Sequence, residues 1–354
     1  MTGPAPKPYR PNTQAELGLD LFPETSHATD AVPVLDLFAG PGGWDQGARD
    51  AGLPLAITGI EIDPWACATA RAAGHKRVQA DAMGLDLTEW HHARGLIASP
   101  PCPTFSAAGL RAGVSDIDAL HDAVTMIGET EPDENGHPAR WTTESWAEVC
   151  ENLKVTDPRN GFFAVAFWAA TRLPNLDWVV LEQVPAATPL FEDIATELEA
   201  VGWHAIVHEI DAADLGLPVR RRRCYLTAAR RPHVIDWTPE PPQTMAGALG
   251  WPAGHRIRTR NNRTGGGGNL FSADGPSWAL TGSARTWERE EDGYQITAAE
   301  AGRLHGFAPD YPWQGTRTRQ FQQIADVVLP PIAGRILTAL HHTTTPPAPG
   351  GFSS

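Results

Sequence analysis

The sequence predicts an α/β protein with a mostly parallel sheet and a small irregular second lobe. Short apolar runs alternate with helical stretches between residues 32 and 230, a pattern typical of parallel strands joined by crossover helices. The first apolar run ends in a glycine-rich turn, AGPGG. Residues 231–275 have few periodic apolar positions, many Gly and Pro and clustered Arg, which indicates an irregular lobe.

The elements follow from hydrophobic periodicity and from the turn residues between them. The expected strands are 32–38, 55–62, 96–99, 178–181, 204–210 and 226–229, and the expected helices are 43–52, 64–73, 162–171 and 191–201. Residues 111–160 are acidic and poor in β-branched residues, and we interpret them as a partly helical insertion. Helical signals return over 297–340.

These elements suggest a division of the chain into segments. We expect a flexible arm over 1–30, a main domain over 31–230 that contains the insertion, a small irregular region over 231–290, a return to the main domain over 291–342, and a disordered tail over 343–354.

The charge is distributed unevenly. The 354 residues include 28 Lys and Arg against 42 Asp and Glu, a net charge of −14, which taken alone argues against a nucleic-acid partner. Residues 215–290, however, carry 12 Arg, no Lys and 5 acids, a balance of +7 that leaves −21 for the remainder. This basic segment is a candidate surface for phosphate contacts.

Composition excludes several other classes. The four cysteines lie far apart without a CxxC pair, and the 13 His show no HExxH motif, so neither a disulfide framework nor a zinc hydrolase or other metal site is indicated. No run approaches the roughly 18 apolar residues that span a bilayer, and the N-terminus has no apolar signal core. We expect a cytoplasmic protein that acts as a monomer without membrane contact.

A nucleotide-type site is expected at the carboxyl ends of the strands, where ligands bind open parallel sheets. The turn DLFAGPGG contains Asp36 and the glycines that allow close approach of a ligand. Glu61 ends the second strand 19 residues after Gly42, the usual position for a carboxylate that binds ribose hydroxyls. Asp81 follows near the end of a third strand, where it can accept from an adenine amino group. Because the motif is not GxGxxG, it favours a methyl donor over NAD; the alternative is a purely structural tight turn.

A candidate nucleophile lies in SPPCPTFS, at the end of a predicted strand. Prolines on both sides restrict the backbone around Cys102, and a nucleophilic thiol needs nearby positive charge to ionise. An isolated Cys is more often a buried structural thiol, but the rigid loop favours the nucleophile. Glu182 follows an apolar strand and, in a cleft, would be a proton donor with a raised pKa; the alternative is a solvated loop carboxylate.

The cluster GLPVRRRRCYL carries four consecutive arginines. Alternation along a strand places Arg221, Arg223 and Tyr225 on one face, and Arg220, Arg222 and Cys224 on the other. The alternative is a solvated patch or a phosphate contact.

Together these motifs resemble the cytosine-5 DNA methyltransferase family. DLFAGPGG, GIEID, ADAMG, SPPCPTFS, LEQV, GLPVRRRR, DGPSWALTG and QQIADVVLPPIAGRIL occur in the order of the family's motifs and cover about two thirds of the chain. The resemblance implies a Rossmann-like S-adenosylmethionine-dependent methyltransferase sheet beside a small target-recognition lobe.

The resemblance also implies roles for individual residues. S-adenosylmethionine would be held by Asp36, Phe38, Ala39, Gly40, Gly42, Gly43, Glu61, Ile62, Asp81, Ala82, Asp326 and Val327. Cys102 would attack C6 of a cytosine flipped out of duplex DNA, and Glu182 would protonate N3. Arg223 would contact the base and Arg221 would support the loops.

The sequence departs from the family's motifs at Pro103, Gln183, Val219 and Ala325-Asp326, none of which replaces a residue that performs bond chemistry. In RIRTRNNRTGGGGNLF, residues Arg256, Arg258, Arg260 and Arg263 are expected to contact DNA; the alternative is a glycine-rich surface loop.

Three functional hypotheses follow. The first is a DNA cytosine-5 methyltransferase, with or without a cognate restriction endonuclease as partner. The second is an RNA cytosine-5 methyltransferase, and the third is a catalytically silent DNA-binding relative, against which the intact Cys102, Glu182, Arg221 and Arg223 argue.

Overall fold

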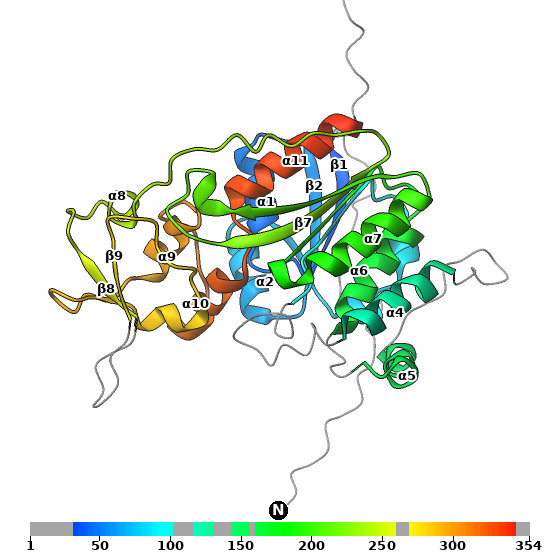
Figure 1. Cartoon of the computed structure of the whole chain (residues 1–354), viewed down its shortest axis with the longest axis horizontal. Coiled ribbons are helices and arrows are strands. Elements are labelled where there is room, and N and C mark those ends of the chain that lie inside the picture. Colours follow the sequence, from blue (N-terminus) through cyan, green and yellow to red (C-terminus); the bar gives the residue numbers. More distant parts are fainter. Residues whose placement is uncertain (1–30, 102–115, 130–142, 156–159, 260–268, 345–354) are drawn as a thin grey trace, which may run out of the picture.

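The computed structural model describes residues 31–101, 116–129, 143–155, 160–259 and 269–344, and its larger part is built on one sheet with the strand order β3-β2-β1-β4-β5-β7-β6 (Figure 1). The strands are β1 Val32–Leu37, β2 Leu55–Glu61, β3 Lys76–Gln79, β4 Gly95–Ala98, β5 Trp178–Gln183, β6 His204–Asp211 and β7 Arg222–Ala229. β1 to β5 are parallel, whereas β7 is antiparallel to both of its neighbours.

Helices cover both faces of this sheet (Figure 1). The helices are α1 Gly43–Asp50, α2 Pro64–Ala72, α4 Ile117–Glu129, α5 Thr143–Leu153, α6 Gly161–Arg172, α7 Thr188–Ala200 and α11 Pro330–Thr344. Side chains alternate along β1, so that Leu35 and Leu37 pack with α4, α6 and α7, while Val34 packs with α1 and α11. α6 reads GFFAVAFWAATR and is buried along most of its length because it lies inside the larger of these two cores.

The second lobe has its own core and lies beside the sheet (Figure 1). It contains the three-stranded sheet β10-β8-β9, and its elements are α8 Met245–Leu249, β8 Arg256–Arg258, β9 Leu270–Ser272, β10 Glu288–Arg289, α9 Ala298–Leu304 and α10 Arg317–Asp326. Apolar residues of α9 and α10 share a cluster with Met245, Ile257 and Phe271, while α11 packs against α1. Hydrophobic packing therefore divides residues 291–342 between the two lobes.

The structure confirms the α/β architecture and corrects several element bounds. β5 continues through Gln183, so Glu182 lies inside the strand rather than after it. β7 begins at Arg222 instead of residue 226, because its polar first residues pair with β6. The second lobe is more regular than expected, since strands of two or three residues are too short to give a periodic signal. The loop EPDENGHP of the insertion lies outside the described residues.

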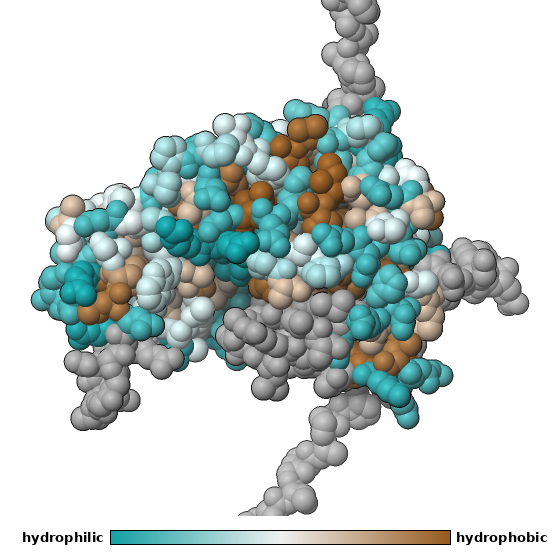
Figure 2. Space-filling view, in the orientation of Figure 1, coloured by the Kyte–Doolittle hydropathy of each residue, from teal (hydrophilic) through white to brown (hydrophobic). Residues whose placement is uncertain are grey.

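Short 3-10 turns lie at Ala82–Gly84, Leu87–Trp90, Pro185–Ala187, Ala212–Asp214 and Gly282–Thr286. Within the described part of the chain, the segment Arg317–Thr344 is long and apolar enough to cross a membrane, but 67% of its apolar window is buried inside the protein, as in the core helix of a globular fold. The face in Figure 2 is largely hydrophilic, with its apolar residues in separate patches.

Candidate functional site

The carboxyl edge of the sheet brings together most of the residues singled out from the sequence. The turn after β1, Glu61 at the end of β2, and Glu182 near the end of β5 all lie there, because these strands are parallel. β7 is antiparallel, so the arginines at its start reach the same edge. Cys102, Arg260 and Arg263 lie outside the described residues.

The glycine-rich turn adopts backbone conformations that favour glycine. Phe38, Gly40 and Gly42 have φ angles of 60°, 53° and 109°. A Cβ added at Gly40 would meet no atom within 4 Å, whereas one at Gly42 would lie 2.8 Å from the hydroxyl oxygen of Tyr311. A Cβ at Gly43 would lie 2.1 Å from the carbonyl oxygen of Val328. Gly40 therefore faces open space, while Gly42 is required by packing against His75 and Tyr311 and Gly43 by packing against Val327 and Val328.

Glu61 is fixed by the backbone on both sides of its carboxylate. Its Oε2 accepts from the amide of Gly40 at 2.9 Å, and its Oε1 accepts from the amide of Asp63 at 2.7 Å. Burial raises the pKa of Glu61, against the lowering effect of these two hydrogen bonds and of Arg77. The next side chain, Ile62, is 63% exposed, so an apolar surface borders this carboxylate.

Two further acids occupy the positions expected for a nucleotide site. Asp81 follows β3 and accepts from the amide of Met83 at 3.0 Å, with Ala82 buried beside it. Asp36 is completely buried in β1, and neither of its carboxylate oxygens has a hydrogen-bond partner among the described residues. Burial raises the pKa of Asp36 well above its usual value, against the lowering effect of Arg77.

The C-terminal motif reaches the same edge through the junction of α10 and α11. Arg221 donates from Nη1 to the carbonyl of Ala325 at 2.6 Å and from Nη2 to that of Val327 at 3.0 Å. Asp326 is exposed and accepts from Nε2 of Gln322 at 2.6 Å. Arg221 therefore ties the start of β7 to the segment that packs on Gly43.

The buried Glu182 and the partly buried Arg223 form an ion pair, with 3.1 Å between Oε1 and Nε. Burial raises the pKa of Glu182, although the charges of Arg223 and Arg221 lower it. Burial and the repulsion of Arg223 lower the pKa of Arg221 to about 10. Both arginines thus lie close enough to Glu182 to lower the pKa of its carboxyl group.

The residues that hold the backbone just before Cys102 were not identified from the sequence. Gln183 donates from Nε2 to the carbonyl of Pro100 at 2.8 Å and accepts from the amide of Val184 at 2.7 Å. Trp44 donates from Nε1 to the hydroxyl of Ser99 at 2.9 Å. Gln183 stands out in the sequence only as a departure from a motif, and no local pattern signals either contact.

The two described arginines of the proposed DNA surface are already engaged with an acid. Arg256 Nη1 lies 3.4 Å and Arg258 Nη2 lies 2.8 Å from Glu290, across the pairing of β8 with β10. Arg256 remains more exposed than Arg258. A phosphate that contacts either guanidinium would compete with Glu290.

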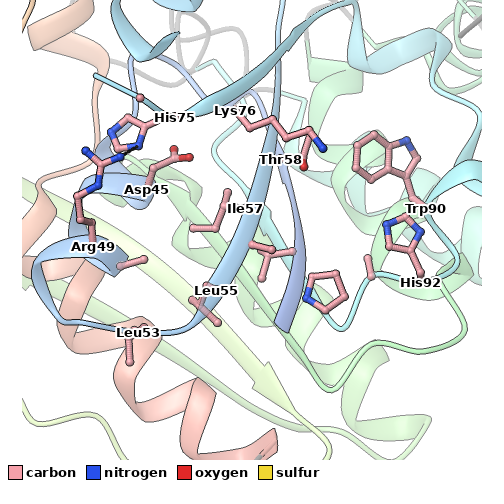
Figure 3. A pocket seen from close by; sticks show the side chains of 16 residues that line it. Asp45, Arg49, Leu53, Leu55, Ile57, Thr58, His75, Lys76, Trp90 and His92 are labelled. Carbon is pink, nitrogen blue, oxygen red and sulfur yellow. Dashed lines mark hydrogen bonds between the residues drawn. The ribbon is translucent and has the colours of Figure 1, made fainter. Parts of the chain in front are cut away.

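A cavity of about 530 Å³ lies elsewhere, near the amino-terminal ends of β1, β2 and β3 (Figure 3). Arg49 and His75 border one side of it, and Trp90 and His92 border the other. None of the residues predicted from the sequence lines this cavity, so it is separate from the carboxyl edge.

Comparison with known proteins gives a consistent result. Residues 32–134 match the family model for C-5 cytosine-specific DNA methylases. The chain is 24% identical to the type II methyltransferase M1.HphI of Haemophilus parahaemolyticus over 88% of its length and 87% of that relative. It is 25% identical to M.NlaX of Neisseria lactamica over 84% of its length and 93% of that relative.

Solved structures share the fold. The Entamoeba histolytica methyltransferase EhMeth superposes with a TM-score of 0.62 at 16% identity, covering 89% of this chain and 99% of that one. A putative DNA modification methyltransferase encoded within an Escherichia coli prophage gives 0.58 at 19% identity, with the same coverage.

Proposed function

Since the chain belongs to the family of C-5 cytosine-specific DNA methylases, we propose that it transfers a methyl group from S-adenosylmethionine to C5 of a cytosine flipped out of duplex DNA. The observation that carries this proposal is the largely buried pair Glu182–Arg223, which shares the carboxyl edge with the glycine-rich turn and with the loop before Cys102.

The residues of the turn fit a donor that contains a nucleoside and positive charge. Asp36 has a buried carboxyl without a hydrogen-bond partner among the described residues. A cationic group of the donor would offset the cost of burying this carboxylate. Gly40 faces open space, and the exposed Ile62 offers an apolar surface beside Glu61 for a base. We assign the ribose to Glu61, the adenine to Ile62, Asp81 and Ala82, and the remainder to Asp36, Phe38, Ala39, Gly40, Gly42, Gly43, Asp326 and Val327.

The proposed chemistry begins at Cys102, whose thiolate adds to C6 of the cytosine. Formation of the S–C6 bond pushes the electrons of the C5–C6 double bond through the ring toward N3. Glu182 delivers a proton to N3 and so neutralises the negative charge that would develop there. When bound, the donor supplies an electrophilic methyl group to C5. A base then removes the C5 proton, the S–C6 bond breaks, N3 returns its proton, and Cys102 leaves as the thiolate.

The arginines divide into two roles under this proposal. Arg223 holds Glu182 at 3.1 Å and lies where it can contact the cytosine that Glu182 protonates. Arg221 contacts the carbonyls of Ala325 and Val327 and stabilises the junction behind the donor site. Arg256, Arg258, Arg260 and Arg263 are assigned to DNA phosphates and bases.

The relatives named above are type II methyltransferases, which supports a role in DNA modification beside a cognate restriction endonuclease. We further propose that the protein acts as a monomer in the cytoplasm, without membrane contact.

Trapping with 5-fluorocytosine tests the proposal. Fluorine at C5 blocks the final elimination, so purified protein with S-adenosylmethionine and fluorinated duplex DNA should form a complex that survives denaturation. Cys102→Ala should form none, and Glu182→Gln should form it far more slowly. Trapping by RNA instead of DNA would identify an RNA methyltransferase, and the absence of any adduct would identify a catalytically silent protein.

A further inference from the structure

The side chain of Arg77 crosses the sheet beneath the glycine-rich turn. From β3 it donates to the carbonyl of Gly40 at 3.1 Å and to that of Ala39 at 3.0 Å. It also makes a two-pronged pair with Asp45, with distances of 3.2 Å and 2.7 Å. Arg77 and Asp45 are almost completely buried. One guanidinium therefore connects an edge strand, the turn and the first turn of α1.

The neighbouring strand leaves a passage for this side chain. Arg77 of β3 pairs in register with Gly59 of β2. A Cβ at Gly59 would lie 2.2 Å from Nη1 and 2.6 Å from Cζ of Arg77, and 2.6 Å from the Cβ of Ala39. Any larger residue at position 59 would displace the guanidinium, so the glycine in GIEID makes room for the side chain of Arg77.

The turn is held from two sides at a single residue. The amide of Gly40 donates to Glu61, and its carbonyl accepts from Arg77. Because a hydrogen bond fixes each of these groups, neither peptide plane beside Gly40 can rotate without breaking one. Loss of the contact with Arg77 would thus be transmitted to the carboxylate of Glu61.

The surrounding charges keep Arg77 ionised. Burial lowers the pKa of Arg77, but the charge and hydrogen bond of Asp45, with the charge of Asp36, raise it above its usual value. Arg77 in turn lowers the pKa of both Asp36 and Glu61, although burial keeps each raised. It is thus the cation that offsets three buried or partly buried acids: Asp36, Asp45 and Glu61.

We propose that Arg77 is a positioning residue that holds the turn Ala39–Gly40 and Glu61 in the shape that binds the methyl donor, through the passage left by Gly59. This rests on the proposed function, because that function assigns the donor to this turn. Lys cannot replace Arg here, since an ammonium lacks the planar fork that serves a carboxylate and two carbonyls at once.

Calorimetric titration with S-adenosylmethionine separates this role from general stability. We expect Arg77→Lys, which preserves the charge beside Asp45, to weaken donor affinity about tenfold or more, equivalent to about 1.4 kcal/mol. The KM for DNA should stay within about twofold. Leu340→Ala, in the core of α11 and completely buried, is the control: it lowers the free energy of unfolding without touching the turn, and its donor affinity should equal that of the wild type.

Should Arg77→Lys not fold, Gly59→Ala gives a second test that leaves every charge in the chain, because its Cβ would press on both the guanidinium of Arg77 and the Cβ of Ala39 in the turn. Donor affinity within twofold of the wild type in the folded variant overturns the proposal, as does an equal loss for donor and DNA. If the wild type binds no S-adenosylmethionine, the proposed function itself is overturned. If the wild type binds it and the variants bind it equally well, only the proposed role of Arg77 is overturned.

Discussion

Glu182 of β5 and Arg223 of β7 form a diagonal pair, two residues from the register partner Tyr225, with 3.1 Å between the carboxylate and the guanidinium. The side chain of Glu182 is 7% exposed and that of Arg223 is 17% exposed. Their pairing depends on β7 running antiparallel to β5, since only then does the beginning of β7 meet the end of β5. The proposed proton donor and the cation that limits its pKa thus come from segments about 40 residues apart.

The first prediction concerns Glu182→Gln. Because Gln cannot donate a proton to N3, we expect the kcat for DNA methylation to fall by about 10²–10⁴-fold, the usual range for loss of a general acid. Donor affinity should stay unchanged, since Glu182 lies outside the glycine-rich turn. Single-turnover methylation with labelled donor measures the loss, and a kcat within threefold of the wild type would contradict the role.

The same variant should change the pH dependence of stability. The pKa of Glu182 in the folded state is raised above 4.5 by burial, so its protonated form is favoured on folding. Its stabilising contribution is present below pH 4.5 and is lost as the pH rises through the raised pKa. Urea unfolding between pH 5 and 8 should therefore show Glu182→Gln gaining stability relative to the wild type as the pH increases; a constant difference would indicate no such shift.

The second prediction concerns Arg221→Lys. The guanidinium of Arg221 bridges two carbonyls, of Ala325 and Val327, and a single ammonium cannot reproduce that fork. We expect a loss of roughly 2–4 kcal/mol in the free energy of unfolding. The control is Arg222→Lys, whose exposed pair with Glu209 should cost less than about 1 kcal/mol. Equal losses for both variants would show that the bridge made by Arg221 contributes no more to stability than the exposed ion pair of Arg222.

The third prediction compares two glycines of one turn. Gly43→Ala places a Cβ 2.1 Å from the carbonyl oxygen of Val328, and this overpacking should cost about 1–3 kcal/mol of stability. Gly40→Ala meets no atom, so its cost is the strain of a positive φ, about 1–2 kcal/mol. Gly40→Ala should weaken donor binding more than Gly43→Ala does, because its Cβ enters the open side of the turn, whereas the Cβ at position 43 points at Val328. Calorimetry and urea unfolding distinguish the two, and donor binding by Gly40→Ala at wild-type affinity would exclude this side as the donor site.

The fourth prediction concerns Glu290→Gln in the second lobe. Glu290 engages both Arg256 and Arg258, so its neutralisation should free them for phosphates. We expect up to about fivefold tighter DNA binding at low salt, the range of an exposed ion pair, and a steeper salt dependence. The control is Asp177→Asn, which removes the same charge from the pair with Arg94 at the amino-terminal ends of β4 and β5. This variant should have less effect on DNA binding. Equal gains would mean that net charge alone is responsible.

The local parts of the site could be predicted because they are encoded by neighbouring residues. The turn after β1, the carboxylate that ends β2 and Asp81 after β3 all occupy the expected places. The strands of two and three residues in the second lobe could not be predicted, since they are shorter than the period needed to recognise them. The length of β7 was underestimated because its first residues are arginines, which are held there by pairing with Glu182 and Glu209.

The sequence by itself determined most strands and helices of the large sheet, the glycine-rich turn and the family to which these motifs are similar. Only the tertiary structure decided what the individual residues of the turn contact. The sequence does not distinguish Gly42 and Gly43 from Gly40, yet only at Gly42 and Gly43 does the missing side chain make room for Tyr311 and Val328. Arg77 has no motif of its own, yet its guanidinium holds the turn. Such roles depend on packing between segments distant in the chain, and the periodicity of a single segment carries no information about its neighbours in space.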